Sequence, residues 1–94
     1  MSYDELRASL LQSLYGRRIV VDPYTIMEVA TLVSLYVSSC ERGYFEGAVK
    51  ALSTVLGKLG VDGYERVAED VIREVVLKGG GGCEENHRHR VTSV

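Results

Sequence analysis

The sequence predicts an all-α protein: a small four-helix bundle with a central apolar helix and a flexible C-terminal tail. Residues 23–40 carry a single charge, Glu28, and are apolar on most sides, which is typical of a helix that neighbouring helices cover. Three further segments repeat apolar residues at helical spacing, and capping residues and glycines separate them. Residues 1–78 are therefore predicted to form a single helical domain, and residues 79–94 a Gly-rich hinge followed by a disordered tail.

The first helix is expected to begin at Ser2 and to end at Gly16. Ser2 and Glu5 have the spacing of a capping box, in which the serine hydroxyl accepts the amide of Glu5 and the glutamate accepts the amide of Ser2. Leucines that recur every four residues mark the face that turns to the core. Gly16 is predicted to stop the helix in the left-handed conformation.

The second helix follows a short apolar segment, residues 19–21. The chain offers no second run for this segment to pair with, so we expect a connector packed on the core, with pairing across a dimer axis as the alternative. Asp22 is predicted to cap the second helix, and Pro23 to occupy its first position, where a missing N–H costs nothing. This helix is expected to fade at residues 38–39 and to stop near Gly43.

The third helix is expected to run from about residue 44 to residue 59, and the fourth from Asp62 to residue 78. Gly60 is predicted to end the third helix, with Val61 folding back in a Schellman contact. Asp62 and Glu65 repeat the capping-box spacing at the start of the fourth helix.

The overall composition limits both the cellular location and the class of partner. The formal net charge is −2, from 11 basic and 13 acidic residues, which gives no general attraction to nucleic acid or to acidic membranes. The N-terminus lacks the basic region of a signal peptide, and the apolar run at 26–37 is short for a membrane span. A cytoplasmic location without membrane contact is the resulting expectation.

One feature of the composition indicates a thermophile. Gln12 and Asn86 are the only side-chain amides in the chain, and such thermolabile residues are scarce in thermophilic proteins. In that setting a disulfide between Cys40 and Cys83 is an alternative even inside the cell, although the sequence favours two free thiols.

The chain contains no Gly-x-Ser-x-Gly, no phosphate-binding glycine loop followed by Lys-Ser/Thr and no His-Glu-x-x-His motif, and we predict that it is not an enzyme and holds no cofactor or metal. A buried Glu28 could serve as an acid or base, but we expect it to lie along a narrow polar stripe. Cys83, His87 and His89 could bind a metal, yet a tail that follows four glycines offers neither a fourth ligand nor a rigid second shell.

The leading hypothesis for function is a helical interaction protein, either a homodimer or a small subunit of a larger assembly, with a ribonucleoprotein as one option for that assembly. The amount of apolar surface exceeds what one bundle of about 80 residues needs, since so short a chain buries only about 60% of its unfolded surface. The residues expected to make the contact are apolar: Ile19, Val20, Val21, Leu32, Tyr36, Phe45, Ala48 and Leu52.

The alternative hypothesis is a nucleic-acid-binding module that uses arginines from the helical domain and the tail. It requires these arginines to share one face of the molecule. They are Arg17, Arg18, Arg42, Arg88 and Arg90.

Overall fold

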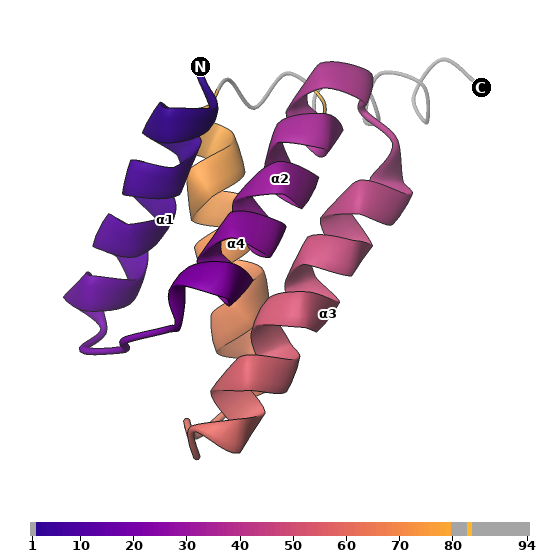
Figure 1. Ribbon diagram of the computed structural model, residues 1–94. Coiled ribbons are helices and arrows are strands. Elements are labelled where there is room, and N and C mark those ends of the chain that lie inside the picture. The colour runs from indigo at the N-terminus through magenta and orange to yellow at the C-terminus, as the bar shows by residue number, and fades with distance from the viewer. Residues whose placement is uncertain (1, 80–82, 84–94) are drawn as a thin grey trace.

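The computed structural model describes residues 2–79 and residue 83, and it confirms the all-α class and the small helical bundle. Four helices form within this part of the chain: α1 (Tyr3–Gly16), α2 (Pro23–Ser39), α3 (Arg42–Lys58) and α4 (Tyr64–Lys78). Consecutive helices run in opposite directions and pack side by side, and α4 returns behind α2 to lie against α1 as well as α3 (Figure 1). The predictions for residues 80–82 and 84–94 lie outside the described residues.

Two helix starts form as the sequence predicts. The Ser2 hydroxyl accepts the Glu5 amide at 3.2 Å, and the Glu5 carboxylate accepts the Ser2 amide at 3.2 Å, so the capping box is confirmed. The Asp22 carboxylate accepts the Thr25 amide at 3.0 Å, and Pro23 occupies the first position of α2. Each cap satisfies an amide that has no partner inside its helix.

The predicted end of α3 is confirmed, and the predicted end of α1 is wrong in one respect. Gly60 takes a left-handed φ of 76°, and the Val61 amide donates to the Leu56 carbonyl at 3.1 Å, which is a Schellman motif. At the end of α1, Gly16 is still helical, and Arg18 is the left-handed residue, with a φ of 61°. The chain thus takes the left-handed conformation two residues later than predicted. The Ile19 amide then donates to the Leu14 carbonyl at 3.0 Å, and the Ile19 side chain packs on the core.

The junction between α2 and α3 is shorter than expected. Cys40 adopts a left-handed φ of 58°, and its amide donates to the Tyr36 carbonyl at 2.7 Å, so the chain turns at once. As a result α3 begins at Arg42, and Gly43 lies within α3 instead of ending α2.

The predicted capping box at the start of α4 is wrong. Gly63 is the N-terminal cap, in a left-handed conformation with a φ of 63°, and no side chain caps this end of α4. Because only the flexible glycine readily adopts that conformation, the turn at residues 62–63 moves Asp62 out of the capping position.

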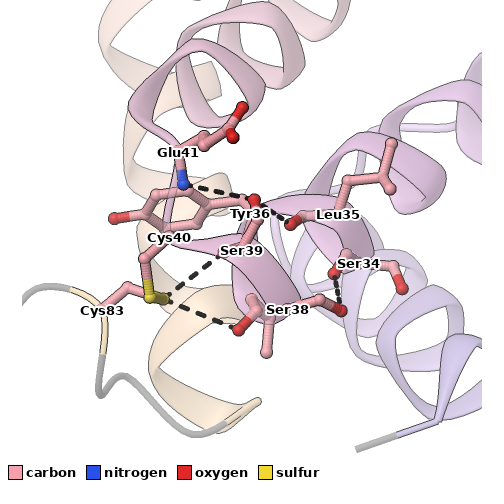
Figure 2. The surroundings of a disulfide bond; sticks show 9 residues. Ser34, Leu35, Tyr36, Ser38, Ser39, Cys40, Glu41 and Cys83 are labelled. Atoms are coloured by element: carbon pink, nitrogen blue, oxygen red, sulfur yellow. Dashed lines mark hydrogen bonds between the residues drawn. A yellow bond between two sulfur atoms is a disulfide. The ribbon is translucent and has the colours of Figure 1, made fainter.

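One hydrophobic core fills the space between the helices, and it includes a residue predicted to lie in the tail. Cys83 is 5% exposed and forms a disulfide with Cys40, so the expectation of free thiols is wrong. Figure 2 shows this sulfur against the last turn of α2, with Sγ 3.4 Å from the Tyr36 carbonyl oxygen. The prediction failed because Cys40 and Cys83, far apart in sequence, meet only after α4 has folded back along α2.

The α2 helix contacts all three other helices, but they do not cover it on every side. Ile26, Val29 and Val33 face the core, whereas the opposite side of α2 faces solvent. The helices of this chain therefore cover the core side of α2 and leave its opposite side exposed. No helix in the described part of the chain is long and apolar enough to cross a membrane.

Candidate interaction surface

Most residues predicted to contact a partner belong to the core of the bundle itself. Only Val20, at 73% exposed, is freely accessible, and Leu32 is half-buried. The remaining six are buried by the chain's own helices: Ile19, Val21, Tyr36, Phe45, Ala48 and Leu52. In the segment 19–21, Ile19 and Val21 are buried and Val20 is exposed, which confirms the expectation of a connector packed on the core.

The exposed side of α2 carries three large apolar side chains that sequence reasoning did not select. Tyr24, Met27 and Leu35 are 82%, 51% and 41% exposed. Their spacing places them along one side of the helix, opposite the core positions. A helical wheel of residues 23–39 places these three residues on one side, but apolar residues occur on most sides of this helix, so the sequence does not distinguish the exposed side. We define the α2 outer face as the exposed residues Tyr24, Met27, Glu28, Thr31, Leu35, Ser38 and Ser39.

The hydroxyl groups on the α2 outer face donate to the backbone of their own helix. Thr31 donates to the Met27 carbonyl at 2.8 Å, and Ser38 donates to the Ser34 carbonyl at 2.9 Å. Ser39 does the same with Leu35 at 2.8 Å, and Figure 2 shows the two serines. Since their donors are already used, these side chains can be covered by an apolar partner at little cost.

A shallow groove of about 380 Å³ runs between α2 and α3 beside the α2 outer face. Gly47 and Ala51 line it from α3, together with Glu28 from α2 and Lys50 from α3. A Cβ added at Gly47 would lie 3.7 Å from a Leu32 methyl, an ordinary contact distance, so α2 and α3 pack closely there. Glu28 is the only charged residue of the α2 outer face.

The three described arginines of the nucleic-acid hypothesis do not form one patch. Arg17 and Arg18 precede the start of α2 and Arg42 follows its end, so the length of α2, about 25 Å, separates them. Arg42 is paired with Glu46 at 3.4 Å. Arg88 and Arg90 lie outside the described residues.

Arg17 takes part in a polar link between α1 and α4. It approaches Glu74 at 3.2 Å, and the Ser13 hydroxyl donates to the same carboxylate oxygen at 2.7 Å. The Ser13 hydrogen bond, assisted by Arg17, lowers the pKa of Glu74 below its ordinary value of 4.5. Ser13, Arg17 and Glu74 contact one another, so this cluster stabilises the packing of α1 against α4.

The remaining candidates for chemistry are not supported by their surroundings. Glu28 is exposed, so the buried acid or base considered for this residue is not present. Cys83 is joined to Cys40 and offers no thiolate to a metal, and His87 and His89 lie outside the described residues. Among the residues that the structure places, no cluster of three metal-binding side chains occurs.

Comparison with protein-family models, with curated proteins and with solved structures found no match for this chain.

Proposed function

We propose that this chain is a non-enzymatic helical interaction protein that associates with a protein partner through the α2 outer face. The supporting observation is the exposure of Tyr24, Met27 and Leu35 on one side of one helix, with Glu28 as the only charge among them. Single exposed apolar residues are common on soluble proteins, whereas several large apolar residues on one helix side that is poor in charge are typical of interaction sites.

The contrast with α4 supports this choice of face. The exposed side of α4 carries four charged residues, Glu65, Arg66, Asp70 and Lys78, and the partly exposed Glu69 and Arg73 form an ion pair at 3.1 Å. That is the pattern of a helix side that remains in water. The α2 outer face has the opposite pattern within the same bundle, and covering it would remove apolar surface from water at little electrostatic cost.

The test is the association state of the full chain and of three lysine variants, measured by sedimentation velocity at tens of micromolar. Met27→Lys and Leu35→Lys place a charge on the α2 outer face, and Leu77→Lys places the same charge at a 64% exposed leucine of α4. We expect the unmodified chain and Leu77→Lys to associate, and the two α2 variants to be monomers with unchanged helical circular dichroism. Because all three positions are exposed, each variant is expected to fold.

Two results would count against the proposal. One is a monomeric unmodified chain throughout this concentration range. The other is an association that Leu77→Lys weakens as much as the α2 variants do.

A further inference from the structure

We infer that the partner of the α2 outer face is a second copy of this chain, related by a two-fold axis that runs along the groove between α2 and α3. This inference rests on the proposed function and adds the partner and its orientation. In such a pair, α2 of each copy lies over α3 of the other, and the two α2 helices point in the same direction. The interface is isologous, so the surface must complement itself.

The contact between Leu32 and Gly47 fixes which residues lie level with one another along the groove. Because α2 and α3 run in opposite directions, moving back one turn from Leu32 to Glu28 corresponds to moving forward one turn from Gly47 to Ala51. Lys50, next to Ala51, therefore lies across the groove from Glu28, and the groove lining confirms that these two side chains share it.

Glu28 and Lys50 have opposite charges, and neither forms an ion pair with another described residue. A two-fold axis along the groove exchanges its two sides without moving residues along it. Glu28 of each copy then faces Lys50 of the other, which gives two equivalent ion pairs. A pair with antiparallel α2 helices would instead place α2 over α2 and leave both charges without opposite partners, so charge complementarity favours the parallel arrangement.

The shapes on the two sides of the groove also match in this arrangement. Leu35 is a large exposed side chain of α2, and the same register places it level with the stretch of α3 near Gly43. A Cβ added at Gly43 would meet no atom within 4 Å, so space is open above that part of α3. Leu35 of one copy can thus pack against α3 of the other at Gly43, as large residues pack against small ones at close helix contacts.

A charge-exchange experiment on the full chain tests this arrangement. Glu28→Lys places two lysines at the groove, and Lys50→Glu places two glutamates there. We expect each single variant to dissociate about tenfold more readily than the unmodified chain, because both ion pairs become repulsions. An equimolar mixture of the two variants is expected to form heterodimers, and the double variant Glu28→Lys/Lys50→Glu to recover homodimers, as measured by sedimentation equilibrium at low salt.

The outcomes separate this inference from the proposed function. If the unmodified chain is a dimer but the mixture associates no better than either variant alone, the two-fold arrangement is wrong and the α2 outer face remains a candidate surface. If the unmodified chain is a monomer, both proposals fail. Recovery by the mixture and by the double variant, with the differences shrinking in high salt, supports the arrangement.

Discussion

The disulfide between Cys40 and Cys83 ties the end of α2 to the segment that follows α4, across a sequence separation of 43 residues. It closes a loop that contains all of α3 and α4. A cross-link of this span removes much of the freedom of the unfolded chain, which is the main source of disulfide stabilisation in the chain-entropy account. In a domain of this size, with a small core, that constraint is a large share of the total stability.

We therefore predict that reduction lowers the free energy of unfolding by up to about 4 kcal/mol, the value expected for a closed loop of this length. Urea denaturation with and without a dithiol reductant measures the effect. The double variant Cys40→Ala/Cys83→Ala should match the reduced protein and should not respond to reductant. Equal midpoints for the oxidised and reduced chains would contradict the prediction.

Ser9 and Ser13 are both buried on α1, and their replacement by alanine is predicted to have different effects. The Ser13 hydroxyl donates to Glu74 at 2.7 Å, so Ser13→Ala should cost about 1 kcal/mol. The Ser9 hydroxyl has no hydrogen-bond partner among the described residues, and Ser9→Ala should be neutral or stabilising by about 1 kcal/mol. Urea denaturation of the two variants provides the comparison. An unchanged stability of Ser13→Ala would show that the link to Glu74 contributes nothing, and a loss in Ser9→Ala equal to that in Ser13→Ala would contradict the predicted difference between the sites.

The pKa of Glu74 leads to a prediction about acid stability. Because the Ser13 hydrogen bond and Arg17 hold this pKa below 4.5 in the folded protein, the ionised carboxylate stabilises the fold. The contribution is complete above pH 4.5 and is lost as the pH falls through the folded pKa. Ser13→Ala should raise the pKa of Glu74 in an NMR titration, whereas Ser9→Ala should leave it unchanged. An unshifted Glu74 in the Ser13 variant would show that the hydrogen bond is absent in solution.

Two glycines that look alike in sequence are predicted to respond differently to alanine. Gly60 has a φ of 76°, so a side chain there is strained, and Gly60→Ala should destabilise the protein by about 1–2 kcal/mol. Gly16 is helical, and a Cβ there would meet nothing within 4 Å, so Gly16→Ala should be neutral or slightly stabilising. Thermal denaturation of both variants checks this, and a loss at Gly16 equal to that at Gly60 would contradict the structure.

Local chemistry made much of the fold predictable from sequence. Ser2, Asp22 and Gly60 act on amides and carbonyls within a few residues of themselves, so their roles could be assigned without knowing the tertiary structure. The left-handed positions of Arg18 and Cys40 could not be assigned in this way. Each depends on where the next segment must go to reach the core, which is a property of the whole bundle.

The candidate surface was only partly predictable for a related reason. Counting apolar residues showed that α2 is unusual, but the residues selected for the interface were mostly the strongest apolar ones, such as Phe45 and Leu52, and these fill the core. The exposed side became clear once the positions of α1 and α3 were known. A disulfide between distant cysteines likewise depends on tertiary structure, since sequence separation does not determine pairing.

Sedimentation equilibrium of the unmodified, oxidised chain over a range of concentrations tests the central claim most directly. The account predicts a reversible equilibrium between monomer and dimer, with dimer dominant at tens of micromolar. A single species with the mass of one chain at every concentration would contradict it.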